Sequence, residues 1–197
     1  MPKLEPNLIL GRCPHCSVAN PNLRVQQHFE TTNHAGGNKR AWFLYVCGRC
    51  GGVVSASASS PNQEVLEMYP GSRSIDEALP DRPKAYLQQA IESLHAPAGA
   101  VMLAASAVDA MLKAKGLLDG SLYKRIEKAA EDHLITPDMA RWAHEVRLDA
   151  NDQRHADHTA DLPSEEDAAR VIDFASALGE LLFVLPQRVQ RGIERAT

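Results

Sequence analysis

The sequence predicts a mainly α-helical protein in which a small N-terminal β module precedes an all-α bundle of about five helices. All four cysteines fall within the first fifty residues, in two Cys-x-x-Cys pairs, whereas a helical repeat of apolar residues begins only after residue 82. The 197 residues, 44% of them hydrophobic, suffice for one ordinary core and a small appended module. We therefore expect a β module at 1–58, a linker at 59–82 and the helical bundle at 83–197.

The two cysteine pairs predict a zinc ribbon bound by Cys13, Cys16, Cys47 and Cys50. Each pair can form a tight turn that directs two thiolates to one point, and two such turns complete a tetrahedron around zinc. Disulfides and a redox-active pair are the alternatives, but disulfides are uncommon in cytosolic proteins and a redox pair usually occurs once, inside a βαβ unit. Four thiolates leave no open position for water, so we expect the zinc to be structural.

Short apolar segments between and after the cysteines predict the strands of this module, at 23–29, 41–46 and 52–57. Few of their residues are large and apolar, so the metal is expected to supply much of the folding free energy. The three histidines of the module are unnecessary as ligands and are expected on its surface: His15, His28 and His34.

Five helices are predicted by apolar residues at i, i+3, i+4 and i+7 and by helix-start signals. They begin at Pro83 with Asp81 as cap, at Pro97, at Leu122, at Pro137 after Thr136, and after Ser164, and the last carries an apolar stripe from Val171 to Leu185. Short connections between antiparallel helices favour a bundle.

The net charge of −4 is distributed unevenly along the chain. Residues 1–60 contain six basic and two acidic side chains, a balance of +4, which leaves −8 for residues 61–197. The charge balance therefore favours the first module as the contact for a nucleic acid. The chain shows neither a signal peptide nor a run of about eighteen apolar residues, so we expect a cytoplasmic protein with no membrane partner.

Arg147, Asn151 and His155 are the strongest candidates for chemistry. They are spaced four residues apart, so successive side chains on a helix rotate by only about 40° and share one face. Arginine can hold a phosphate, asparagine can orient a hydroxyl group, and histidine can transfer a proton near neutral pH. Such a set can cleave RNA through its own 2′-hydroxyl group without a metal. The alternative is a polar helix end that is solvated or paired internally.

From about Tyr69 onward the chain resembles a bacterial family, the domain of unknown function 4145. The resemblance rests on Tyr69-Pro70, Leu79-Pro80, Tyr86, the 104–112 helix, Gly120 to Tyr123 and the Arg147–His155 stretch. That family is similar to the HEPN superfamily, helical bundles of bacterial defence and RNA processing, many of which are metal-independent ribonucleases that act as dimers.

The resemblance implies an HEPN-like bundle in which Arg147 and His155 form the catalytic pair, with Asn151 between them. Ala150 stands where the family usually has glycine, and Ser106 to Asp109 stand where it usually has an arginine and a glutamate.

Three functions are compatible with these observations. The first is a zinc-binding accessory or interaction module for a protein or nucleic acid, linked to bacterial defence or RNA metabolism. The second is a dimeric, metal-independent endoribonuclease, and the third is a nucleotide or small-molecule sensor. A homodimer is expected because Phe183, Val184 and Val189 lie off the main apolar stripe of the last helix.

Overall fold

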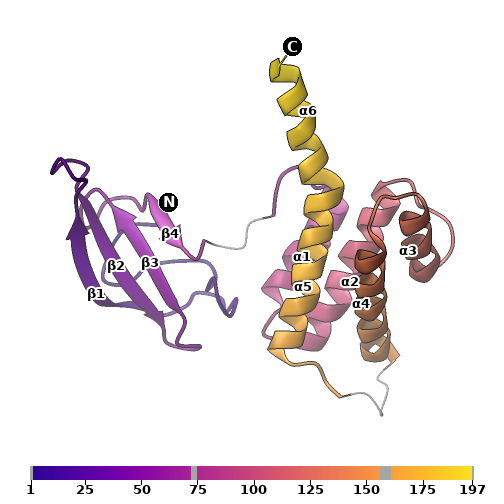
Figure 1. Cartoon of the computed structure of the whole chain (residues 1–197). Coiled ribbons are helices and arrows are strands. Elements are labelled where there is room, and N and C mark those ends of the chain that lie inside the picture. Colours follow the sequence, from indigo (N-terminus) through magenta and orange to yellow (C-terminus); the bar gives the residue numbers. More distant parts are fainter. Residues whose placement is uncertain (1, 72–74, 156–160, 197) are drawn as a thin grey trace. The chain divides into compact units, whose positions relative to one another are not determined.

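The chain folds as two compact units, residues 1–74 and residues 75–197 (Figure 1). The computed structural model describes residues 2–71, 75–155 and 161–196. The first unit contains a small antiparallel sheet and the second contains helices. The prediction of a mainly α chain with a small N-terminal β module is confirmed.

The sheet of the first unit has four antiparallel strands in the order β1-β2-β3-β4. Their bounds are β1 (Leu23–Thr31), β2 (Arg40–Cys47), β3 (Val53–Ala58) and β4 (Glu67–Tyr69). The first three overlap the predicted strands. The fourth falls in the segment 59–82 that was predicted as a linker, and at three residues it is too short to show a period of its own.

One face of this sheet forms a small core. It contributes alternate residues of β2 and β3, and the N-terminal segment covers it with Leu4 and Leu8. Tyr45 is fully buried there and donates a hydrogen bond to the backbone oxygen of Glu5 at 2.8 Å. Among the described residues, eleven buried apolar side chains make up this core, and three of them are cysteines. The unit therefore has little apolar area with which to stabilise itself.

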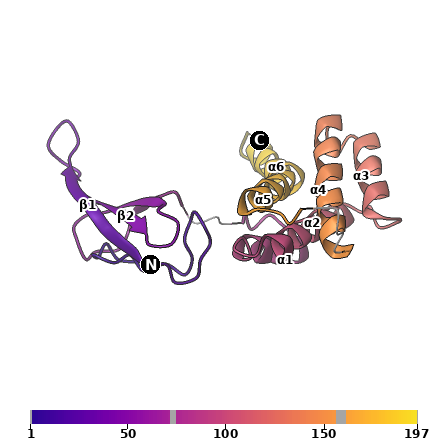
Figure 2. The same cartoon turned by 90° about the horizontal axis from the view of Figure 1, so that it is seen from below.

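The second unit is a bundle arranged around one central helix (Figure 2). Its elements are α1 (Asp81–Glu92), α2 (Pro97–Ala114), α3 (Leu122–Glu131), α4 (Pro137–His155), α5 (Glu165–Gly179), the π-helical segment η1 (Glu180–Val184) and α6 (Leu185–Ala196). The central α2 contacts α1, α3, α4 and α5. It is long and apolar enough to cross a membrane by length and composition, yet half of that span is buried inside the protein, as in a core helix.

The helix starts follow the predicted signals with one exception. Thr136 Oγ1 accepts a hydrogen bond from the backbone N–H of Met139 at 3.2 Å, and Ser164 forms a capping box with Asp167. The prediction of Asp81 as cap is wrong, because α1 begins at Asp81 itself and Pro80 occupies the capping position without a side-chain bond. Asp81 instead places its charge in the positive first turn.

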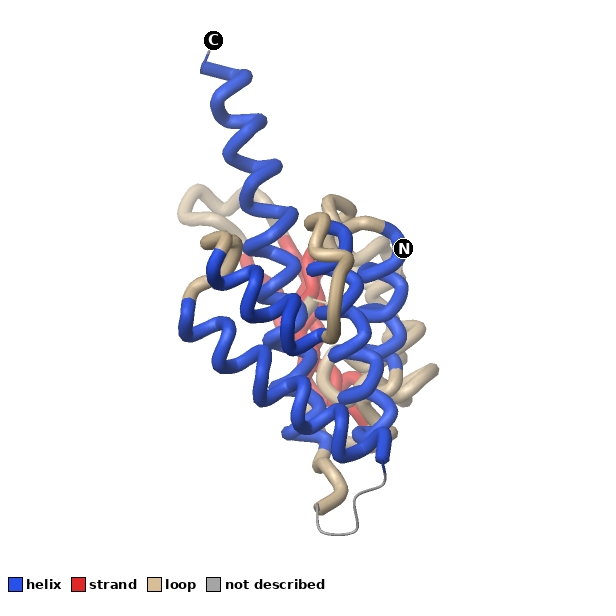
Figure 3. The backbone as a smooth tube through the Cα atoms, turned by 90° about the vertical axis from the view of Figure 1, so that its right-hand side faces the viewer, coloured by secondary structure: helices blue, strands red, loops and turns tan. Residues whose placement is uncertain are grey.

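The last helix contains a π-helical segment that was not predicted. It passes from α5 through η1 into α6 without a break and ends at Ala196, beyond the rest of the bundle (Figure 3). Pro186 has no N–H to donate and its ring crowds the preceding turn of an ordinary α-helix. We attribute the wider π-helical turn at η1 to this proline. Every described side chain of α6 is exposed.

Candidate metal centre and candidate ligand cleft

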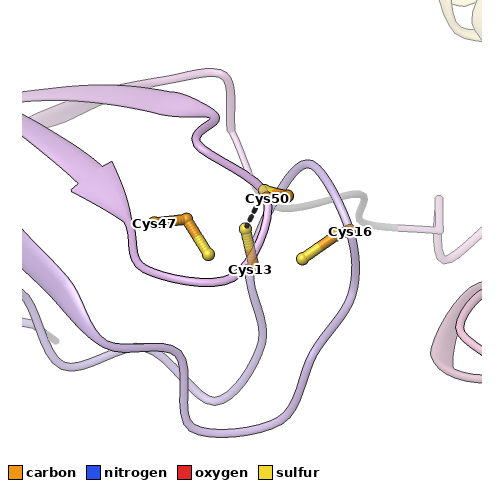
Figure 4. Close-up of side chains that lie close together, drawn as sticks. All are labelled: Cys13, Cys16, Cys47 and Cys50. Atoms are coloured by element: carbon orange, nitrogen blue, oxygen red, sulfur yellow. Dashed lines mark hydrogen bonds between the residues drawn. The ribbon is translucent and has the colours of Figure 1, made fainter.

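The structure brings the four cysteines of the first unit to one point (Figure 4). Their sulfur atoms all lie within 4.8 Å of one another, and the Sγ atoms of Cys13 and Cys50 are 4.0 Å apart. Four sulfurs at about 2.3 Å from one tetrahedral ion stand about 3.8 Å apart. Cys13, Cys16 and Cys47 are buried, and Cys50 is exposed. The donor set therefore fits one metal ion.

Two equivalent backbone turns present these sulfurs. The N–H of Ser17 donates to the oxygen of Cys13 at 3.0 Å, and the N–H of Gly51 donates to the oxygen of Cys47 at 2.9 Å. Each turn ends with a residue of positive φ, 55° at Ser17 and 71° at Gly51. A residue with this backbone conformation closes a Cys-x-x-Cys turn back on itself, and glycine adopts it without strain.

His15 connects the first cysteine turn to the start of β3, just after the second turn. Its Nε2 lies 2.8 Å from the backbone oxygen of Val53, so this nitrogen carries the proton and donates. A Cβ added at Gly52 would lie 2.5 Å from the His15 ring, so the ring fills the space that a side chain would need. His15 is exposed, as predicted, but it has a structural contact that the spacing of the cysteines did not indicate.

The surroundings of the four thiols shift the pKa values of three of them in different directions. Burial raises the pKa of Cys47, but the backbone at Cys50 and Arg49 and the thiols of Cys13 and Cys50 lower it to about 7. Burial raises the pKa of Cys13, and burial with the neighbouring thiols raises that of Cys50 to about 12. Crowded thiols resist losing several protons together, and a cation among them removes this penalty.

A cleft of about 840 Å³ lies in the second unit, between α1, α2, α3 and α4. Five of the side chains that line it are cationic, and one is acidic. The cations are Arg82, Lys113, Arg125, Arg147 and Arg154, and the acid is Asp109.

Asp109 pairs with two of these cations. Its carboxylate accepts from Arg125 Nη1 at 2.8 Å and from Lys113 Nζ at 2.6 Å. Arg125 is 8% exposed and also donates from Nη2 to the backbone oxygen of Leu118 at 3.1 Å. Arg125 is therefore fixed in the wall of the cleft, while Lys113 is held at its edge.

The other three cations have no acidic partner among the residues that the structure describes. Among the described residues, no ion pair involves Arg82, Arg147 or Arg154. The Arg147 guanidinium lies over the Tyr123 ring at 5.5 Å from its centroid, and its Nε is buried without a hydrogen-bond partner. The opening of the cleft therefore presents an excess of positive charge.

The three predicted chemical residues lie on α4 but in different surroundings. Arg147 and the exposed Asn151 line the cleft. His155, at the last position of α4, is exposed and is not among the side chains that line the cleft. Within one chain, the structure thus joins two of the three residues in one cavity.

Sequence reasoning missed three cleft cations, Arg82, Lys113 and Arg125, and treated Arg154 only as part of a polar stretch. They come from four separate helices, so no spacing along the chain links them. The available signal was Asp109 and Lys113, two opposite charges four residues apart in a mostly apolar helix.

A comparison with protein-family models matches residues 88–195 to the family described as domain of unknown function DUF4145. The match covers more than half of the 197 residues and most of the helical unit. Comparisons with curated proteins and with solved structures found no match. The chain therefore belongs to the family of domain of unknown function DUF4145.

Proposed function

We propose that the first unit is a zinc ribbon and that the chain is a cytoplasmic accessory or interaction module with an HEPN-like bundle. Such a module would act in bacterial defence or in RNA metabolism and would bind a protein or a nucleic acid. The convergence of the four sulfur atoms carries the proposal, because a tetrahedral set of thiolates favours zinc among the common cellular divalent metals.

The zinc would be structural. Four sulfur ligands leave no open position for a reacting water molecule. The unit also needs such a contribution, since eleven buried apolar residues form its core, against 28 in the helical unit. Binding free energy of the metal then becomes folding free energy of residues 1–74.

Metal analysis and limited proteolysis test this proposal. Purified protein should contain one zinc per chain, and cobalt substitution should give the absorption of a tetrahedral thiolate site. Cys47→Ser should lose the metal and expose residues 1–74 to protease, whereas Val53→Ser, an exposed change on a neighbouring strand, should retain both properties. A metal-free wild-type chain that resists protease equally well would contradict the proposal.

Metal-independent RNA cleavage is the second candidate. It is supported by Arg147 and Asn151, which border one basic cavity. Arg147 would hold the phosphate, Asn151 would orient the reacting hydroxyl group, and His155 would transfer the proton. Incubation of purified protein with mixed RNA and a chelator should give products that His155→Ala abolishes and that His133→Ala leaves unchanged. Cleavage that persists in His155→Ala would exclude this role.

We also propose a homodimer formed through the last helix. Leu185, Val189 and Ile193 are 47%, 54% and 58% exposed and lie four residues apart on α6. A second copy of α6 would cover this stripe. The molar mass in solution should correspond to two chains and should fall to one chain in Val189→Asp but not in Gln187→Asp. A wild-type monomer at high micromolar concentration would exclude the dimer.

A sensor for a nucleotide or another small molecule is the third candidate. Its support is the cleft, whose volume lies within the range of about 300–1,000 Å³ that is typical of small-molecule sites.

A further inference from the structure

The charge of the cleft is opposite to that of the unit that contains it. Residues 75–197 contain 14 lysines and arginines and 21 aspartates and glutamates, a balance of −7. Among the described residues, five of those cations and one acid line the cleft, a balance of +4. A uniform distribution of these side chains over the unit would give the cleft more acids than cations.

The cations of the cleft differ in how deeply they are buried. Arg125 is buried and already paired with Asp109. Arg147 is half-buried against Tyr123, and Arg82 and Arg154 are exposed at the opening. The paired Arg125 forms the floor, and Arg82, Arg147 and Arg154, which form no ion pair with any described residue, lie nearer the opening.

Arg147 is held in a position to bind an anion. Its guanidinium is held over a ring and its Nε is removed from water without a partner. A buried donor without a partner is costly, and an anion that accepts from the remaining N–H groups of this guanidinium would offset part of that cost. A cation that is partly desolvated also binds an anion more strongly than one in bulk water.

We propose that this cleft binds a compact, phosphate-bearing small molecule through Arg82, Arg147 and Arg154. Asp109 pairs with Arg125 and Lys113 and partly neutralises the floor and edge of the cleft. The proposal rests on the small-molecule candidate above and is independent of the zinc and of RNA cleavage.

The chemistry of the three arginines favours phosphate over carboxylate. Each guanidinium presents a planar fork of donors that pairs with two oxygen atoms. A carboxylate offers two oxygens and one negative charge, whereas a terminal phosphate offers three oxygens and up to two charges. A chain of phosphates therefore presents more acceptor oxygens and more charge to three forks than a tricarboxylate of similar size. The net charge of such a chain also matches the balance of +4 in the cleft.

The size and surroundings of the cleft favour a small ligand over a polynucleotide. The cavity of about 840 Å³ accommodates a molecule of nucleotide size. The unit around it carries the balance of −7 and repels a long polyanion that extends beyond the cavity.

Inorganic tripolyphosphate is the probe for the test, with citrate as a tricarboxylate control, in titrations of the full chain by calorimetry. Tripolyphosphate should bind at least tenfold more tightly than citrate. Arg147→Gln should weaken binding about tenfold, and Arg147→Lys, which keeps the charge but loses the fork, should fall between. Arg141→Gln removes the same charge from the same helix outside the cleft and should change the dissociation constant less than twofold.

Three results would overturn the proposal. These are the absence of tripolyphosphate binding, an equal loss in Arg141→Gln and Arg147→Gln, and binding only to a 5′-phosphorylated oligonucleotide. Circular dichroism of each variant identifies unfolding, and Arg82→Gln with Arg154→Gln repeats the test at exposed positions. Metal content measured on the same samples separates the two proposals, because a metal-free chain that binds tripolyphosphate contradicts only the zinc ribbon.

Discussion

Replacing Asp109 by asparagine should destabilise the helical unit while it strengthens anion binding. The Asp109 carboxylate accepts from Arg125 at 2.8 Å and from Lys113 at 2.6 Å. The Arg125 side chain is only 10% exposed, whereas Lys113 is 45% exposed. The buried partner therefore dominates the effect, because water screens the pair with Lys113.

The magnitude follows from these two contacts. A hydrogen bond to a charged group contributes about 1.5–3 kcal/mol, and an exposed i, i+4 pair contributes about 0.3–0.5 kcal/mol. Asparagine retains the shape and one acceptor, so we expect Asp109→Asn to lower the free energy of unfolding by about 2–3 kcal/mol. For a unit of this size, that corresponds to a decrease in melting temperature of about 6–15 °C.

Thermal unfolding followed by circular dichroism measures this effect, with Asp138→Asn as the control. Asp138 pairs with Arg141 on the surface of α4, where both side chains are largely exposed, so its replacement should cost less than about 0.5 kcal/mol. Tripolyphosphate should bind Asp109→Asn several-fold more tightly, since the cleft loses its one negative charge. Equal stability of the two variants, or weaker binding by Asp109→Asn, would refute this account of Asp109.

Three further changes test the fold. Phe174→Ala removes a fully buried ring from the helical core and should cost about 3–5 kcal/mol in urea unfolding. Ser164→Ala removes the cap of α5 and should cost about 1 kcal/mol. Hydrogen bonds from Ser164 lower the pKa of Asp167. The stabilisation that they give is present above the unfolded pKa of about 3.9 and is lost as the pH falls through the folded pKa. Ser164→Ala should therefore raise the pKa of Asp167 in an NMR titration. Gly52→Ala displaces the His15 ring and should make residues 1–74 more sensitive to protease, with Gly11→Ala, in open space, as control.

Sequence reasoning succeeded where structure depends on local chemistry. Two Cys-x-x-Cys turns predict a metal site because each turn orients its own thiols, and the hairpin of β1 and β2 then has only to bring the turns together. Caps such as Ser164 and Thr136 predict helix starts because the side chain binds a backbone N–H three residues away.

The same reasoning fell short where structure depends on several elements. The three-residue β4 forms because β3 offers it hydrogen-bonding partners, and the cleft forms because four helices converge. The prediction that Arg147, Asn151 and His155 share a face used the geometry of one helix alone. The structure adds arginines from α1 and α3 to that face and leaves His155 outside the cleft.

Repulsion among the positive charges in the cleft destabilises the ligand-free protein, and an anionic ligand would remove this repulsion. Arg82, Arg147 and Arg154 share one opening, and among the described residues none of them is in an ion pair. Like charges repel, so replacing Arg154, which is exposed, by glutamine should leave the ligand-free protein unchanged or more stable by up to about 0.5 kcal/mol.

With tripolyphosphate bound, the wild-type chain should become more stable than Arg154→Gln. The ligand should raise the melting temperature of the wild-type chain more than that of Arg154→Gln, because stabilisation by a ligand follows its affinity for the folded state. Arg170→Gln, a matched change on α5 outside the cleft, should show no such reversal. Removal of Arg154 that destabilised the ligand-free chain would show instead that this arginine supports the fold, and the excess charge would then need no ligand to explain it.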